Sequence, residues 1–223
     1  MCAERSLAAS LALAVVAFLP AAARPAGPVR QDVSVRPTFA DAAHLAEWDF
    51  DGSGEWTMAK GLLILAKAGV PSGPIRRPAA VAILKTPPMV RVTVETQIRS
   101  TAALDVVNRD LEIVFGYESP SRFYYVHLAG ITNDVHNGIF LVAGADRRRI
   151  DPGKTPPQLK DQNWHDVRLE RDGSTGRVQV YVDRSPTPAW DLVDTTIRAG
   201  RVGLGSFDDT GEFRNVAVKG SRQ

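Results

Sequence analysis

Two histidines and the closely spaced acids Asp110 and Glu112 lie within one short stretch of this sequence, residues 109–142, which has the pattern of adjacent β-strands. The pattern predicts three antiparallel strands, over 109–117, 122–129 and 136–142. If both connections are tight, the register places Glu112, His127 and His136 in one row across the three strands. Neighbouring Cβ atoms in such a row lie about 5 Å apart. A carboxyl group beside two imidazoles can move protons, or can hold zinc or a related divalent metal ion.

The alternation of side chains along these strands predicts an apolar face and a mixed outer face. The outer face carries further candidate ligand-binding residues, which are Asp110, Phe123, Tyr125 and Phe140. Aromatic rings stack on the C–H patches of a sugar, and acids and imidazoles bond its hydroxyl groups. We expect Gly138 opposite Tyr125 and Gly116 opposite Phe123, which would leave these rings uncovered. The alternative is that this is the ordinary solvated outer face of a sandwich.

Two more candidates lie outside this stretch. Residues 90–99 alternate apolar and polar side chains, which is typical of a half-buried strand. If this strand pairs with the one that begins at Arg109, Gln97 extends the polar face toward Glu112. Arg148 belongs to a run of three arginines in a loop, which can clamp an anionic or polyol ligand. A solvated basic loop is the alternative for that run.

The charge balance excludes one class of partner. The chain has 223 residues, with 27 Lys plus Arg against 25 Asp plus Glu. A protein that binds nucleic acid normally concentrates many uncompensated cations, so we expect no nucleic-acid partner.

The N-terminus has the anatomy of a secretory signal peptide. Residues 1–23 begin with charged residues, continue with an apolar run over 7–19, and end in three alanines at 21–23. The run is too short for a typical membrane span, so we expect a secreted or periplasmic protein with no stable membrane insertion after cleavage. An uncleaved anchor is the alternative. The only cysteine, Cys2, lies in this segment, so the mature chain has no disulfide.

The remaining chain divides into a short connection and one domain. Residues 24–38 carry several prolines and no apolar period, which indicates a linker. Residues 39–223 show a short helical turn, many short strands and frequent turn signals. Together with the absence of long helical patterns, this predicts an all-β, two-sheet antiparallel sandwich.

Three segments of the sequence resemble segments of proteins with known folds. Trp56–Leu65 looks like the opening of concanavalin A-like lectin and glucanase jelly rolls, where a Trp strand is followed by a glycine and an apolar strand. Trp164–Asp183 resembles the hairpin of laminin-G-like domains in the same superfamily. Gly200–Val218 is similar to the ending of bacterial secreted domains of the 3-keto-disaccharide hydrolase type. The resemblance implies a jelly roll with a concave face that binds glycans in many members.

The resemblance also implies a structural calcium near the first and last strands, to which Asp208 or Asp209 could contribute. Retaining glucanases of this fold carry Glu-x-Asp-x-x-Glu on one strand, whereas this chain has only Asp110 and Glu112. This departure argues against glucanase activity. The 3-keto-disaccharide resemblance implies a hydrolase or lyase instead, with base and electrophile supplied by Glu112, His127 and His136. A carbohydrate-binding domain without catalysis is the first reading, and this enzyme is the alternative.

Overall fold

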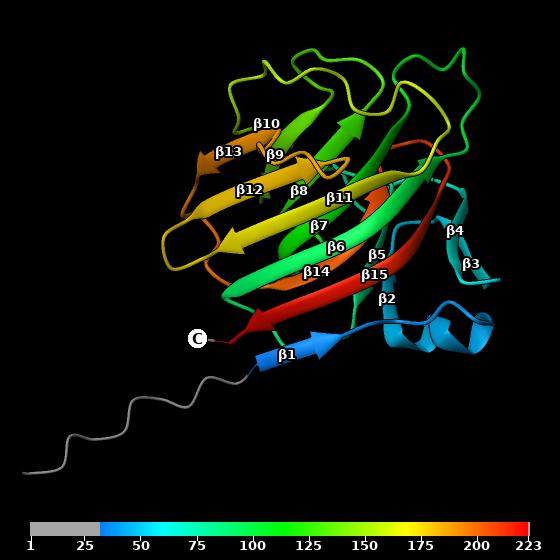
Figure 1. The fold of residues 1–223 in the computed structure, drawn as a ribbon, viewed down its shortest axis with the longest axis horizontal. Coiled ribbons are helices and arrows are strands. Elements are labelled where there is room, and N and C mark those ends of the chain that lie inside the picture. The colour runs from blue at the N-terminus through cyan, green and yellow to red at the C-terminus, as the bar shows by residue number, and fades with distance from the viewer. Residues whose placement is uncertain (1–31, 223) are drawn as a thin grey trace, which may run out of the picture.

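The computed structural model describes residues 32–222. Two antiparallel sheets lie face to face, and nearly all of the connecting segments are short loops (Figure 1). The first sheet has eight strands in the order β13-β12-β11-β6-β15-β4-β3, with β1 paired to β15. Its strands are β1 (Asp32–Val35), β3 (Glu55–Ala59), β4 (Leu62–Lys67), β6 (Arg91–Ser100), β11 (His165–Asp172), β12 (Arg177–Val182), β13 (Trp190–Val193) and β15 (Gly211–Ser221).

The second sheet has seven strands in the order β10-β9-β8-β7-β14-β5-β2. Its strands are β2 (Trp48–Asp51), β5 (Ala80–Leu84), β7 (Asp110–Ser119), β8 (Arg122–Ala129), β9 (Gly138–Ala143), β10 (Arg148–Arg149) and β14 (Arg201–Ser206). One short 3₁₀ helix, η1 (Ala42–Glu47), lies where the sequence predicts a helical turn, and the Asp41 side chain caps its first turn. No helix within residues 32–222 has the length and apolarity needed to cross a membrane.

The core lies between the two sheets, because each central strand presents alternate side chains to it. On β6, Val92, Val94, Thr96 and Ile98 are buried, while Thr93, Glu95 and Gln97 between them are at least partly exposed. On the facing sheet, Ile113, Phe115 and their neighbours on β8 and β9 join the same cluster. The predicted all-β two-sheet antiparallel sandwich is therefore confirmed.

Two expectations about the chain's organisation need correction. We expected residues 24–38 to be a linker, but Asp32–Val35 form β1, which pairs with β15. The rest of that predicted linker before residue 32, and the whole predicted signal peptide, lie outside the described residues. We also expected the strand at 90–99 to pair with the strand at 109. Instead β6 lies in the other sheet, where it pairs with β11 and β15, two strands from much later in the sequence.

The outer face of the seven-stranded sheet is covered, which the sequence did not indicate. A second apolar cluster on this face includes Phe123, Tyr125 and Phe140, each at most 2% exposed. Two segments cross it and bond to each other, since the Arg147 N–H donates to the Arg76 carbonyl and the Arg76 N–H donates to Asp146. Ile75, from the same connection between β4 and β5, packs against this cluster. This sheet therefore has apolar side chains buried on both faces.

Candidate functional site

The register of β7 and β8 brings Glu112 and His127 side by side, as predicted. Glu112 pairs with His127 directly across the two strands, and Asp110 lies two residues along on the same face of β7. The turn between these strands is tighter than expected, because Ser119 and not Tyr117 pairs with Arg122. A bulge between Phe115 and Ser119 follows, and Gly116 within it has φ +60°, a conformation that favours glycine. The bulge offsets the tighter turn, so Glu112 and His127 still pair as predicted.

His136 reaches the same place from a loop instead of a strand. In β9, Gly138 is the residue that pairs with His127, and Tyr125 pairs with Phe140, so the expected glycine-opposite-ring arrangement is wrong. The ring of His136 nevertheless lies edge-on to that of His127, with centroids 5.6 Å apart. All three residues of the predicted row are therefore neighbours, although His136 is held by the loop that precedes β9.

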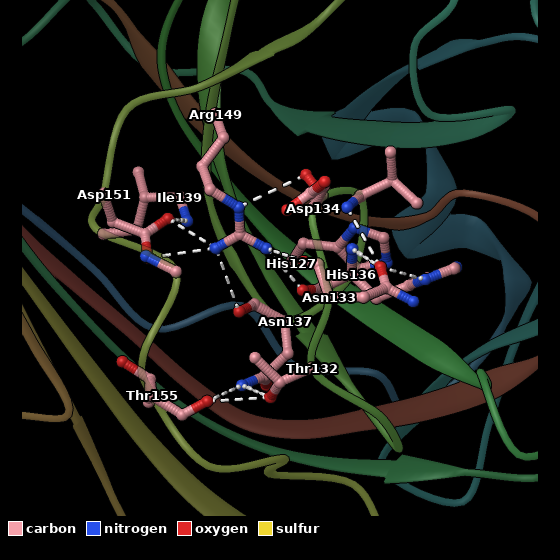
Figure 2. Close-up of polar contacts among 12 residues, drawn as sticks. His127, Thr132, Asn133, Asp134, His136, Asn137, Ile139, Arg149, Asp151 and Thr155 are labelled. Carbon is pink, nitrogen blue, oxygen red and sulfur yellow. Dashed lines mark hydrogen bonds and ion pairs between the residues drawn. The ribbon is translucent and has the colours of Figure 1, made fainter.

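Arg149 fixes that loop, and sequence analysis did not single it out. Figure 2 shows its guanidinium between the Asp151 carboxylate, at 2.9 and 3.0 Å, and the backbone carbonyls of Asn133, Asp134 and His136. Gly138 makes room for this arrangement, since a Cβ atom there would lie 2.0 Å from a guanidinium nitrogen of Arg149. The loop that carries His136 is thus positioned from β10.

Asn137 anchors the same loop from the other side. It is fully buried, has φ +51°, and donates to the Thr132 hydroxyl and to the carbonyls of Thr155 and Pro156 (Figure 2). Asparagine adopts this left-handed backbone more readily than most residues. His136 therefore comes from a stretch whose backbone is specified at both ends.

Arg147 and Phe207 close the cluster from above, and neither was predicted. The ring of Phe207 stacks on that of His127 at 6.1 Å, with the planes 9° apart. The Arg147 guanidinium lies 3.9 Å from the Phe207 ring centroid and donates to the Tyr125 hydroxyl at 2.9 Å and to His127 Nδ1 at 3.1 Å. The only sequence signal for Arg147 was its place in the run of three arginines that can clamp a ligand.

The contact with Arg147 decides the tautomer of His127. A guanidinium can only donate, so His127 Nδ1 must accept, and the ring proton lies on Nε2. His127 Nε2 faces Asp110 Oδ2 at 3.4 Å. His127 is therefore held between a donor, Arg147, and a carboxylate, Asp110.

Asp110 and Glu112 have opposite protonation tendencies although both are fully buried. Burial opposes ionisation of Asp110, but His127, the Phe207 N–H at 2.7 Å and the Ser206 hydroxyl at 2.8 Å outweigh it and lower the pKa of Asp110. Burial and the charge of Asp110 raise the pKa of Glu112 well above its usual value. Among the described residues, neither carboxyl oxygen of Glu112 has a hydrogen-bond partner. The surroundings thus favour the protonated form of Glu112 and the ionised form of Asp110.

His136 has the accessible lone pair of this site. Its Nδ1 lies 2.9 Å from the Asn133 side-chain oxygen, so Nδ1 carries the proton and Nε2 is an acceptor. Burial, followed by His127 and Arg147, lowers the pKa of His136. The ring is therefore neutral at pH 7.

The predicted metal ligands fit a transition metal poorly. Of the predicted ligands Glu112, His127 and His136, only the first two offer ligand atoms within 4.8 Å of one another in a group of three, and Asp110 takes the place of His136 there. A metal-bound histidine normally donates its other N–H to an acceptor, whereas the other nitrogen of His127 faces the donor Arg147. A metal at Nε2 would require Arg147 to leave.

Oxygen ligands for calcium fit better. Asp110, Asp208 and Asp209 also offer oxygens within 4.8 Å of one another. Burial, together with the charges of Asp110 and Asp208, raises the pKa of Asp209 to about 6, a repulsion that a cation would relieve. Calcium prefers carboxylate oxygens, so these three residues are the ones that would hold it.

Several predicted ligand-binding residues lie apart from the cluster or out of reach. Phe123, Tyr125 and Phe140 are buried, so they cannot stack on a sugar in this conformation. Gln97 is in the other sheet, where it bonds Asp166, Arg214 and Asn215. Arg148 is exposed and turns toward Asp194, at 3.8 Å, instead of toward the histidines.

Comparison with solved structures places this sandwich among known folds. Carbohydrate-binding module CBM66 from Bacillus subtilis superposes with a TM-score of 0.54 at 15% identity, covering 76% of this chain and 93% of that one. The winged bean acidic lectin complexed with methyl-α-D-galactose gives a TM-score of 0.54 at 14% identity, covering 86% and 100%. A candidate glycosyl hydrolase from Parabacteroides distasonis gives 0.54 at 11% identity, covering 82% and 96%.

These likenesses define the fold. The chain has a two-sheet jelly-roll fold similar to those structures, the fold that the concanavalin A-like resemblance in its sequence implied. No family model matches the sequence, and no curated protein matches it either.

Proposed function

We propose that this protein is an exported carbohydrate-binding domain, and that a sugar contacts the accessible rim of the cluster on the seven-stranded sheet. The rim consists of His136, Arg147, Phe207 and Asp208, all at least partly exposed. The observation that carries the proposal is that these groups converge over the buried Asp110, Glu112 and His127.

The rim offers the bonding partners that sugar hydroxyls require. His136 Nε2 and the Asp208 carboxylate accept hydrogen bonds, and Arg147 donates them. Burial and the charge of Asp110 raise the pKa of Asp208, so this carboxyl can also donate when it is protonated. Phe123, Tyr125 and Phe140, which were predicted to stack on a sugar, are buried and do not belong to the proposed rim.

Two further points support a glycan partner and export. Among the structures of similar fold, one is a carbohydrate-binding module and one is a lectin complexed with a galactoside. The signal-peptide pattern over residues 1–23 suits delivery to a compartment where glycans are met.

A glycan array with isothermal titration of the hits tests this proposal. His136→Ala and Asp208→Asn are expected to weaken binding by about tenfold each, the equivalent of one hydrogen bond to a charged or well-placed group. Glu47→Gln, an exposed change on η1 far from the rim in sequence, serves as the control and should bind like the parent chain. Absence of binding to any glycan, by correctly folded protein, would refute the proposal.

A second candidate, cleavage of a 3-keto-glycoside, is favoured by one observation. The pKa of Glu112 is raised and that of Asp110 beside it is lowered, and such divergent pKa values of two carboxyl groups are typical of acid–base catalysis. Elimination beside a ketone needs a base to remove the adjacent proton, for which His136 Nε2 is available, and an acid to protonate the departing oxygen, for which Glu112 is suited. Because Glu112 is 0% exposed, Phe207 and Arg147 would have to move aside.

Turnover of 3-keto-disaccharides separates the two candidates. If the protein is an enzyme, Glu112→Gln should lower kcat by 100-fold or more, since general acid catalysis contributes about 10²–10⁴-fold. If parent protein binds glycans but releases no product, the enzyme candidate is rejected and the binding proposal stands.

A further inference from the structure

Two hollows lie on the outer face of the eight-stranded sheet, away from the cluster described above. One has a volume of about 530 Å³ and is lined by residues of β1, β6, β11, β12 and β15. The other has a volume of about 470 Å³ and is lined by the next part of β6, β11 and β15, with Tyr181 of β12 and the residues that follow that strand. Both are therefore built on the same central strands.

The register shows that the hollows follow each other along these strands. The first lies at Thr93, which pairs with Glu170 on β11, and the second lies at Glu95 and Gln97, which pair with Arg168 and Asp166. Residues 91–97 of β6 span about 20 Å at roughly 3.4 Å per residue. The hollows thus lie in line along the sheet, and together, named the trough below, they are long enough for several linked sugar units.

A small residue and a bulge shape the trough. Ala217 of β15 pairs with Glu95, so the wall beside Glu95 has almost no side chain. The register of β15 against β6 shifts between Arg214 and Ala217, and Asn215 within the shift has φ +53°. Such bulges redirect side chains and are frequent next to functional sites.

The charges in the trough largely compensate one another. Arg91 bonds Asp172 at 3.1 Å, Arg184 bonds Asp166 at 3.0 Å, and Arg168 pairs with Glu170. A surface neutralised in this way does not attract a polyanion such as nucleic acid. The ligand that matches it is uncharged and rich in hydroxyl groups.

Two polar groups in the trough are available to form hydrogen bonds with a ligand. Glu95 is exposed, and neither oxygen of its carboxylate bonds to a described residue. The Tyr181 hydroxyl likewise bonds to no described residue, while Arg168 lies 3.9 Å from its ring centroid. Glu95 and Tyr181 both flank Arg168 across the strands, so an acceptor and a hydroxyl stand in one row.

We propose that this trough is a second glycan-binding face, which takes the interior of a linear, uncharged polysaccharide. The inference rests on the proposed carbohydrate-binding function but uses none of its rim residues. Two hollows in line along the strands suit an internal segment of a polymer, whereas the rim on the opposite sheet meets a sugar locally.

Affinity electrophoresis in gels containing xylan, laminarin or dextran, beside titration with the matching trisaccharides, tests the inference. Variants Glu95→Gln and Tyr181→Phe remove one bonding group each and keep the side-chain shape. The double variant is expected to bind polysaccharide about tenfold more weakly or worse, with trisaccharide binding unchanged. His136→Ala should weaken binding of both probes, and Glu47→Gln should weaken neither. Thermal unfolding confirms that every variant is folded.

The other outcomes are distinguishable. If the double variant binds polysaccharide like the parent chain, or if the parent binds trisaccharides but no polysaccharide, the trough inference is overturned and the rim proposal stands. If the parent binds none of these probes and no glycan on the array, the proposed function fails and the trough inference fails with it.

Discussion

At the scale of single residues, Asp110 and Glu112 show how surroundings set the role of a side chain. They are two residues apart on β7, equally buried and on one face, yet donors surround only Asp110. A buried carboxyl group with neither oxygen bonded costs about 1–3 kcal/mol in lost hydrogen bonding. A chain that tolerates this cost at Glu112 is consistent with a role for that residue in binding or catalysis, as proposed above.

Amide substitutions of the two acids should therefore differ in effect. Asp110→Asn replaces an oxygen by a donor amide facing the Phe207 N–H, the Ser206 hydroxyl and His127, and is expected to lower the free energy of unfolding by about 1.5–3 kcal/mol. Glu112→Gln exchanges one neutral group for another and should change it by less than about 0.5 kcal/mol at pH 7. Urea denaturation of both variants measures this. Equal losses would contradict the assigned protonation states.

Asp209 predicts a pH dependence of stability. Its pKa in the folded protein is about 6, above the ordinary value of 3.8, so the folded state holds the proton more tightly than the unfolded state. The stabilisation from this group is complete below about pH 4 and is lost as pH rises through about 6. Asp209→Asn should remove this contribution and raise the Tm at pH 7–8 measured with a calcium chelator present. Asp191→Asn, an exposed carboxylate with a lowered pKa, is the comparison and should not raise the Tm. Identical pH profiles for the parent and Asp209→Asn would count against the raised pKa.

At the scale of elements, the sequence predicted the hairpin of β7 and β8 well where the strands are regular. Alternation fixes which residues share a face, and a slip of two residues keeps that assignment. This is why Glu112 and His127 were placed correctly despite the bulge at Gly116, and why the core face was placed correctly on β9 despite its shifted register. His136 could not be placed in this way, because a loop pinned by Arg149 from a later segment positions it.

The clamp at Gly138 gives a prediction for this element. Gly138→Ala places a methyl group against the Arg149 guanidinium and 2.5 Å from an Asp151 oxygen. Overpacking of this kind costs about 1–3 kcal/mol. Gly144→Ala, just after the same strand, meets no atom within 4 Å but has φ +74°, so it reports the cost of backbone strain alone. We expect Gly138→Ala to be destabilising in urea and also to broaden the NMR signals of the His136 ring, whereas Gly144→Ala should leave that ring unchanged. An unaltered His136 environment in Gly138→Ala would contradict the proposed clamp.

At the scale of the whole molecule, the sequence does not indicate which of the two sheets a strand joins. The alternation of apolar and polar side chains in β6 is the same whichever sheet the strand joins. Only pairing with β11 and β15, more than 60 residues later, decides which sheet β6 belongs to. The cover over Phe123 and Tyr125 has the same origin. It is made by segments near Arg76 and Arg147 that meet through tertiary contacts, and local patterns carry no information about such contacts. The predicted sandwich was thus confirmed, while the expected solvent-exposed face was wrong.

The position of β1 shows how the ends of the described chain are joined. Its four residues pair with the end of β15, and Val33 and Val35 pack against the main core, so the first and last strands stabilise each other (Figure 1). Without β1, the end of β15 from Val218 to Ser221 would present an unpaired edge on that side, and such edges promote association between chains.

Removal of residues 24–35 should therefore lower stability and solubility, compared with removal of residues 24–31 alone. Loss of two partly buried valines and four paired residues is expected to cost about 2–3 kcal/mol in the free energy of unfolding, based on about 1.5 kcal/mol or less for each valine and small contributions from pairing. Urea denaturation and light scattering of the two truncated chains provide the measurement. Glycan binding by the chain that lacks residues 24–35 should persist at the rim, because β1 pairs within the opposite sheet. Equal stability of the two chains would mean that β1 adds nothing to the sandwich. Loss of rim binding together with β1 would mean that the two sheets are more tightly coupled than the separate clusters on their outer faces indicate.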